Sequence, residues 1–478
     1  MNWDFSLANY GSVWSFLVQL SLLLICLLIG NILRNVVPFF KKYLIPSALI
    51  GGALLLLVNF IFKQFDITLV DNRMMQVITY HALGIGFAAM TLRNKNKHVK
   101  VNKTQVVEFG AMQGGTYMLQ AFVGLLITIV LFLITKGSTN EQSFISGLIL
   151  PLAFGQGPGN ALTWDINYTN NPGAGFTGNG SFGLSLASIG FIVASVCGII
   201  YINYFKKKGL ITVRKSGKKE NIYCYKNEIP DNESVDKFSI QMGFVVLAYA
   251  LAFGFMCLLG VVSDFTNSIA WGFNFMWAAL AAMLIKVILN QAKKHNVMKR
   301  EYINNYQMDR ISGFFFDLMI VAGVAAIQIN DIKNYILPII ILSVVGSVIT
   351  LIYVRKVAKH CFKGFEHEFF LMGFGTLTGT ASNGMILMKE IDPNLQTPTA
   401  NLYVMSNFPA MVMIAPLLFL LNFASLSLSN AIISCVIFFV LWLAYTIYIF
   451  RRKVFKKKYS GVEENIWTDS EVMYERNE

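Results

Sequence analysis

Phe154-Gly155-Gln156-Gly157-Pro158-Gly159-Asn160-Ala161 and, later in the chain, Phe374-Gly375-Thr376-Leu377-Thr378-Gly379-Thr380-Ala381 are two glycine-rich breaks in otherwise apolar sequence. Phe, Gly, Gly and Ala recur in both breaks at the same relative positions. In hydrocarbon an unpaired backbone N–H or C=O costs several kcal/mol, so irregular backbone occurs there only when it is buried in protein or lines a watery cavity. The two matched breaks therefore predict one site that both of them form.

The composition is that of an integral membrane protein. The 478 residues are 55% hydrophobic and 14% charged, and the mean hydropathy of +0.55 exceeds what a soluble domain can cover with polar surface. The first apolar run, 14–32, lacks a basic leader and a cleavage pattern, so we expect it to be retained. The six cysteines are scattered without a C-x-x-C pair, so we expect neither a disulfide framework nor a metal site.

The net charge of +13 comes from short basic segments that lie between the apolar runs. Basic segments in this arrangement are typical of the cytoplasmic loops of membrane proteins. We therefore expect the partner of this basic chain to be a lipid bilayer and not nucleic acid.

Eleven apolar segments are long enough to cross a bilayer, which takes about 20 residues each. They fall at 13–33, 45–62, 74–92, 105–135, 180–205, 238–260, 270–290, 311–329, 336–354, 399–423 and 428–450. Two more stretches, about 144–164 and 368–388, contain the breaks and fit either full spans or re-entrant hairpins. The sequence thus predicts an all-α polytopic membrane protein with about 11 transmembrane helices.

The distribution of Lys and Arg decides between spans and hairpins. With the N-terminus outside and both stretches returning as hairpins, most basic residues lie inside and the C-terminus is inside. The outer basic residues are then Lys63, Arg73, Lys136 and Lys333. A full crossing at 144–164 would put the basic segment 206–237 outside, against the positive-inside rule. The charges therefore favour two hairpins.

This topology contains a five-plus-five inverted repeat, because each half has five spans and one hairpin in opposite orientations. The segments are an N-terminal repeat, 1–205, a basic cytoplasmic linker, 206–237, a C-terminal repeat, 238–423, an extra transmembrane helix, 424–450, and a cytoplasmic tail, 451–478. The linker is expected to be solvated, with a membrane-surface or partner-binding role as the alternative. Inverted repeats with broken elements near the bilayer midplane are typical of secondary transporters, so the sequence indicates transport.

The residues of the two breaks suit both an anion and a cation. Backbone N–H groups at half-helix N-termini bind anionic groups, and free carbonyls with hydroxyls bind Na⁺. The alternative is that the glycines only permit close helix packing. The substrate-binding candidates are Gly155, Gln156, Gly157, Gly159, Asn160, Gly375, Thr376, Thr378, Gly379, Thr380, Ser382 and Asn383.

Asp317 and two asparagines extend the candidate site. Asp317 is an acid well inside the span 311–329, where it either meets a cationic group or forms a contact between helices. Asn401 and Asn407 precede two prolines in the span 399–423, where carbonyls freed by proline add ligands. The candidate Na⁺ ligands are Thr378, Thr380, Asn401 and Asn407.

No catalytic motif is present in the sequence. It has no G-x-S-x-G, H-E-x-x-H or P-loop pattern and no pair of intramembrane carboxylates of a protease kind. The stretch 155–159 superficially resembles a dinucleotide-binding loop, but the strand and helix that such a loop needs around it are missing. We therefore do not expect an enzyme.

Several motifs, taken in order, resemble the bacterial sodium:glutamate symporter family over most of residues 10–420. They are the segment 41–46 with Gly51-Gly52, Leu83-Gly84-Ile85-Gly86 up to Arg93, the two breaks, and Gly175-Phe176-Thr177. The resemblance implies a Na⁺-coupled importer in the bacterial cytoplasmic membrane, a homodimer, and a translocation site formed by two re-entrant loops. Relatives that transport glutamate carry His and Thr where this chain has Gln156 and Pro158, and the segment 428–450 goes beyond their usual ten spans.

The resulting expectation is a secondary active symporter in which inward Na⁺ drives uptake of glutamate or a related anionic amino acid or dicarboxylate. A hairpin-bearing core is expected to move against spans one, two, six and seven by an elevator-like or rocking motion. Another organic anion, or H⁺ coupling through Asp317 or His81, is the alternative within this class. A channel or sensor is the alternative from another class, but each hairpin plugs one side, which favours alternating access.

Overall fold

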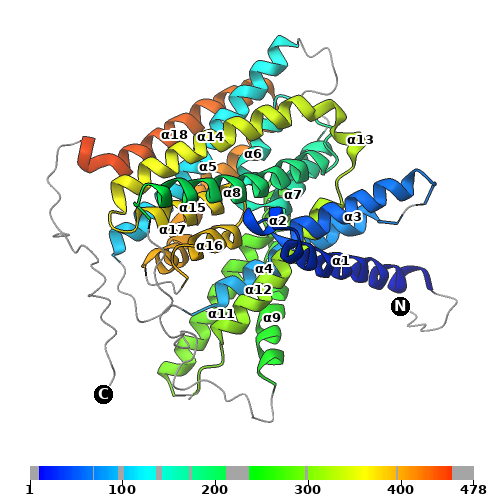
Figure 1. Ribbon diagram of the computed structural model, residues 1–478, viewed down its shortest axis with the longest axis horizontal. Helices are drawn as coiled ribbons and strands as arrows, with labels where there is room; N and C mark the ends of the chain where they lie inside the picture. Colours follow the sequence, from blue (N-terminus) through cyan, green and yellow to red (C-terminus); the bar gives the residue numbers. More distant parts are fainter. Residues whose placement is uncertain are drawn as a thin grey trace.

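The computed structural model describes residues 10–67, 69–94, 102–135, 143–171, 175–211, 236–296, 300–393 and 397–454. All regular elements in these ranges are helices, as the sequence predicts (Figure 1). The first half contains α1 (Tyr10–Val36), α2 (Pro38–Lys42), α3 (Ser47–Lys63), α4 (Asn72–Leu92), α5 (Lys103–Ile134), η2 (Ser146–Leu148), α6 (Ile149–Gln156), α7 (Pro158–Thr169) and α8 (Ser181–Lys207). The second half contains α9 (Lys237–Gly260), α10 (Asp264–Gly272), α11 (Asn274–Lys294), α12 (Asn305–Ala325), α13 (Ile329–Ile332), η4 (Lys333–Tyr335), α14 (Ile336–Cys361), α15 (Glu366–Thr378), α16 (Ala381–Lys389), α17 (Thr399–Ser425) and α18 (Leu428–Val454).

Nine helices of the described ranges are long and apolar enough to cross a membrane, namely α1, α4, α5, α8, α9, α11, α14, α17 and α18. The predicted spans 45–62 and 311–329 also form helices, but α3 has only 17 residues and α12 carries three charged residues. The prediction of an all-α polytopic membrane protein is therefore confirmed, whereas the number of eleven crossings stays a prediction. Most of the predicted linker, 212–235, and most of the predicted tail, 455–478, lie outside the described residues.

Polar side chains account for where several helices begin. Oδ1 of Asp71 accepts the backbone N–H groups of Arg73 and Met74, at 2.9 and 3.2 Å, and so caps α4. Asn102 and Asn304 cap α5 and α12 in the same way. Such caps satisfy N–H groups that have no carbonyl partner in the first turn of a helix.

The helices form two groups. The first, which we call the hairpin body, comprises α5–α8 and α14–α18 and shares one apolar core. The second group has two further cores, one among α1, α3, α4 and α12 and one among α4, α9, α11 and α12. Figure 1 shows the hairpin body in the upper part of the view, with α1 and α3 to the right and α9 and α11 below. The two groups meet where α4 and α12 pack against α7.

Each glycine-rich break lies between two helices. Hairpin 1 consists of η2, α6 and α7 and is broken at Gly157, and hairpin 2 consists of α15 and α16 and is broken at Gly379 and Thr380. The two hairpins run over 146–169 and 366–389, close to the stretches 144–164 and 368–388 that the sequence singles out.

Both arms of hairpin 1 reach the same end of the hairpin body. Thr128, near the end of α5, donates a hydrogen bond to the carbonyl of Phe144 just before the hairpin, at 2.8 Å. Tyr168, in the last turn of α7, donates to the carbonyl of Leu421 near the end of α17, at 3.2 Å. Since α18 begins where α17 ends and runs antiparallel along α5, the ends of α5, α7 and α17 lie together.

Both arms of hairpin 2 reach the opposite end. Glu366, at the start of α15, pairs with Arg355 in the second half of α14, at 3.2 Å. Leu387, near the end of α16, packs against Gly198 in the second half of α8. A Cβ on Gly198 would stand 2.6 Å from the Leu387 side chain. Because α8 begins beside the end of α7 and runs away from it, the two hairpins open toward opposite ends of the hairpin body.

Candidate functional site

The breaks of the two hairpins face each other. Gly157 has a φ of +83°, and a Cβ there would stand 3.1 Å from Cγ2 of Thr380 and 3.9 Å from the carbonyl oxygen of Gly379. The helices before the breaks, α6 and α15, also pack against each other. The structure thus brings together two segments that are far apart in the sequence, and we call their meeting point the junction.

Two helix N-termini open at the junction without a side-chain cap. Gly157 is the N-cap of α7 and Thr380 is the N-cap of α16, and neither provides a side-chain hydrogen bond to its helix. The first N–H groups of a helix have no carbonyl partner within the helix and carry a positive partial charge. An anion at the junction would therefore be stabilised by both helix ends.

Three buried side chains at the junction have a polar atom without a hydrogen-bond partner in the described part of the chain. These atoms are Oδ1 of Asn160, Oγ1 of Thr380 and Nδ2 of Asn383. Asn160 is fully buried, Asn383 is 3% exposed and Thr380 is 7% exposed. A buried polar atom without a partner costs about 1–3 kcal/mol, so three of them in one place indicate a ligand. The oxygens suit a cation such as Na⁺, and the amide nitrogen suits a carboxylate.

Helix α5 holds both hairpins beside the junction. Tyr117 donates a hydrogen bond to the carbonyl of Gly155 at 2.7 Å. Gln120, one turn later, donates from Nε2 to the carbonyl of Leu377 at 3.1 Å and to Oγ1 of Thr350 at 2.8 Å. Sequence reasoning missed Tyr117 and Gln120, although two polar residues on one face of an apolar span are the signal that identifies them.

All twelve predicted residues of the two breaks lie within about one helical turn of a break. Gln156 accepts a hydrogen bond from Asn160 at 2.6 Å. The hydroxyls of Thr376 and Thr378 donate to carbonyls one turn back in α15, at 2.8 and 2.7 Å, and their oxygens keep lone pairs for a cation. Ser382, in the first turn of α16, is half-buried.

Asp317 faces away from the junction. Met319, on the same helix, has its Cε 3.7 Å from the Cβ position of Gly157. A residue two positions earlier lies about 200° around an α-helix, and the charge that acts on Asp317 is that of Arg34 on α1. The structure therefore does not bring Asp317 to the other predicted site residues.

The two asparagines of α17 lie on different faces of that helix. Tyr403 of α17 reaches the side chain of Thr376 in hairpin 2. Asn407 lies four residues after Tyr403 and shares its face, whereas Asn401 lies two residues before it and about 200° around the helix. The structure therefore places Asn407, and not Asn401, on the side of α17 that faces hairpin 2.

Asp165 is a buried acid that sequence reasoning also missed. Its two carboxylate oxygens accept the backbone N–H groups of Gly180 and Gly183, at 2.8 and 2.7 Å. This fully buried carboxylate holds α7, the returning arm of hairpin 1, to the start of α8. An acid in the stretch Ala161-Leu162-Thr163-Trp164-Asp165 is itself a signal, because ionisable residues in such segments are costly.

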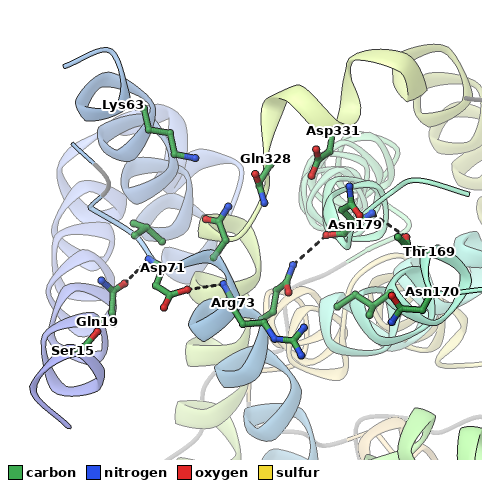
Figure 2. A pocket seen from close by; sticks show the side chains of 14 residues that line it. Ser15, Gln19, Lys63, Asp71, Arg73, Thr169, Asn170, Asn179, Gln328 and Asp331 are labelled. Carbon is green, nitrogen blue, oxygen red and sulfur yellow. Dashed lines mark hydrogen bonds between the residues drawn. The ribbon is translucent and has the colours of Figure 1, made fainter. Parts of the chain in front are cut away.

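A polar cavity of about 910 Å³ opens at the end of the molecule where α7 finishes (Figure 2). We call it the vestibule. It is lined by residues of α1, α3, α4, α7 and α13 and of the segments that flank them, including Gln76 of α4. Thr79 lies on α4 one turn after Gln76. Both Thr79 and Pro158 lie against Gly323 of α12, where a Cβ would stand 3.5 Å from the side chain of Thr79 and 3.1 Å from that of Pro158. The vestibule thus ends about one helical turn from the break of hairpin 1.

A family model described as sodium/glutamate symporter matches residues 14–393. The match includes both hairpins and all helices from the first to the sixteenth, apart from the first residues of α1. A comparison with curated proteins gives no match. Because the matched segment is most of the chain, the protein belongs to the sodium/glutamate symporter family.

Proposed function

We propose that the protein is a secondary active transporter that couples inward movement of Na⁺ to the uptake of glutamate or a related anionic amino acid or dicarboxylate. Membership of the symporter family supports Na⁺-coupled transport as the class of function. The observation that carries the site assignment is the junction, where two uncapped helix N-termini meet three buried polar atoms without partners in the described chain.

In this proposal the junction holds the substrate and the ion together. The N–H groups that begin α7 and α16, with Nδ2 of Asn383, bind a substrate carboxylate. The side-chain oxygens of Asn160, Thr378 and Thr380 bind Na⁺. Among the described residues no group of three or more His, Cys, Asp or Glu side chains is placed to hold a metal ion. Because opposite charges a few ångströms apart attract each other, each ligand strengthens the binding of the other, which couples their transport.

The packing of the helices supports a five-plus-five inverted repeat. In the repeat, α1, α3 and α4 of the first half correspond to α9, α11 and α12 of the second. Helix α1 packs against α3, and likewise α9 packs against α11. Helix α3 packs against α12 of the other half, and likewise α11 packs against α4. The third long helices of the two halves, α4 and α12, pack against each other, as elements beside a pseudo-two-fold axis do. Such a repeat allows one site to open to each side of the membrane in turn.

We place the protein in a bacterial cytoplasmic membrane with its N-terminus outside and its C-terminus inside. The ends of α8 and α18, which carry Lys206, Lys207, Arg451 and Arg452, then lie inside, in accord with the positive-inside rule. Hairpin 1 enters from outside, hairpin 2 enters from inside, and the vestibule is external. We also propose a homodimer, which the mass of the solubilised protein tests.

The contact between the hairpin body and the second group supports relative movement. Leu83 of α4 packs against Gly159, where a Cβ would stand 2.8 Å from its side chain, and Pro158 packs against Gly323 of α12. Apolar contacts of this kind are non-directional, so one surface can slide or rock over the other at little cost. This fits an elevator-like or rocking motion of the hairpin body.

Uptake into proteoliposomes tests the proposal. Radiolabelled glutamate is supplied with an inward Na⁺ gradient or with K⁺ in its place, together with a panel of unlabelled amino and dicarboxylic acids. We expect accumulation that needs the Na⁺ gradient and is blocked by excess glutamate. Inhibition by another acid but not by glutamate would overturn the substrate, and uptake indifferent to every ion gradient would overturn the transporter itself.

A further inference from the structure

We propose that the vestibule is a second substrate-binding site, in which Arg73 binds a carboxylate before the substrate reaches the junction. The proposal rests on the proposed function for its orientation and for the anionic class of substrate. Its physical basis is a cation whose side chain has no partner among the described residues, in a polar cavity that leads toward hairpin 1 (Figure 2).

The guanidinium of Arg73 is free to bind an anion. It forms no hydrogen bond or ion pair with any residue that the structure describes, and only the backbone N–H of Arg73 is bound, by Asp71. Figure 2 shows the side chain extending from α4 toward the side of the cavity that α7 forms. Arginine presents a planar fork of donors that matches the two oxygens of a carboxylate.

The carboxylates of the vestibule have other roles than neutralising this guanidinium. Asp71 caps α4 with Oδ1. Asp331 hydrogen-bonds with Asn179 and Ser181, and Lys63 is the cation whose charge acts on it. Burial raises the pKa of Asp331, which makes its negative charge less favourable. Arg73 is therefore a lining cation, beside Lys63, whose guanidinium has no hydrogen bond or ion pair with a described residue and can bind an anion.

The rest of the vestibule suits a small polar solute. Its neutral lining includes the amides of Gln76, Asn170, Asn179 and Gln328, which can donate further hydrogen bonds to a carboxylate. The cavity volume of about 910 Å³ holds an amino acid with part of its hydration. A site of this kind raises the local concentration of an anion and so its rate of arrival at the junction.

Uptake kinetics test the role of the charge. Arg73→Gln is expected to raise the KM for glutamate about five- to tenfold while kcat changes less than about twofold, because capture weakens and the junction is intact. High salt should reduce the difference from the parent protein by screening. Lys333→Gln is the matched control, since it removes the same charge from η4, which does not line the vestibule, and it should leave KM unchanged.

A second experiment does not depend on transport. Asn170→Cys places a thiol at an exposed position of the vestibule lining, and its labelling is measured in phosphatidylcholine vesicles against the protein without this cysteine. An anionic thiol reagent should react several-fold faster than a cationic one, and Arg73→Gln should remove the preference. Glutamate should slow the labelling of Asn170→Cys when Arg73 is present, and it should not slow the labelling of the double variant with Arg73→Gln.

The two experiments separate the two proposals. Equal labelling rates for both reagents, or an unchanged preference in Arg73→Gln, would overturn the vestibule site even if uptake is normal. The expected preference together with absent uptake would support the vestibule site and contradict the proposed function.

Discussion

Gly157 and Thr380 lie in contact across the junction, with Cγ2 of Thr380 3.1 Å from the Cβ position of Gly157. Each residue is the N-cap of a helix whose first N–H groups have no side-chain cap. The distance between these two residues therefore determines how large an anion can fit between the two helix N-termini.

Gly157→Ala should reduce uptake about tenfold or more, because displacements of about 1 Å at a binding site have effects of this size. The φ of +83° strains any residue with a Cβ, and the new methyl group would press on Thr380. Gly175→Ala is the control: Gly175 also has a positive φ, +56°, but no atom of the described residues lies within 4 Å of its Cβ position. Similar losses of uptake in both variants would show that strain, and not obstruction of the junction, is the cause.

Thr380→Val should weaken the apparent Na⁺ affinity about tenfold, which corresponds to about 1.4 kcal/mol for one ligand. Its thermal stability should change little, since the removed oxygen has no partner among the described residues. The measurements are the Na⁺ dependence of uptake and the melting temperature in detergent.

Thr128→Val is the control for this change. The hydroxyl of Thr128 lies away from the junction. It donates a hydrogen bond to the carbonyl of Phe144 at 2.8 Å and accepts one from the backbone N–H of Gly147 at 3.3 Å. Its loss should lower the melting temperature and leave the Na⁺ affinity unchanged. The reverse pattern in the two threonine variants would contradict the assignment of Thr380 as an ion ligand.

Asp165→Asn should destabilise the protein by about 1–3 kcal/mol, because an amide cannot accept both N–H groups that the carboxylate accepts. These N–H groups belong to Gly180 and Gly183. The melting temperature of the purified variant measures the effect. An unchanged value would mean that this carboxylate does not hold hairpin 1 to α8.

Arg451→Met should destabilise the protein by about 3–5 kcal/mol, as the loss of one partner of a buried ion pair does. Arg451 of α18 pairs with Glu108 of α5 at 3.0 Å, and the Glu108 side chain is only 3% exposed. The double variant with Glu108→Gln should recover much of the loss in a double-mutant cycle. Additive losses in the two single variants would show that Arg451 and Glu108 do not stabilise each other.

The sequence predicts the helices and both breaks well because these depend on local chemistry. Apolar runs, glycines and Pro158 determine where a helix continues and where it stops. The side of α12 that meets hairpin 1 depends instead on tertiary packing, which is why Asp317 was expected at the site although the structure turns it away. Tyr117 and Gln120 become recognisable only once α5 is known to lie beside both hairpins.

The most direct test of the central claim is equilibrium binding of radiolabelled glutamate to the purified protein in Na⁺ and in K⁺. We predict saturable binding in Na⁺ and none in K⁺, lost in Gly157→Ala and kept in Gly175→Ala. Binding that is equal in both ions, or that survives unchanged in Gly157→Ala, would contradict the assignment of the junction as the shared site of substrate and Na⁺.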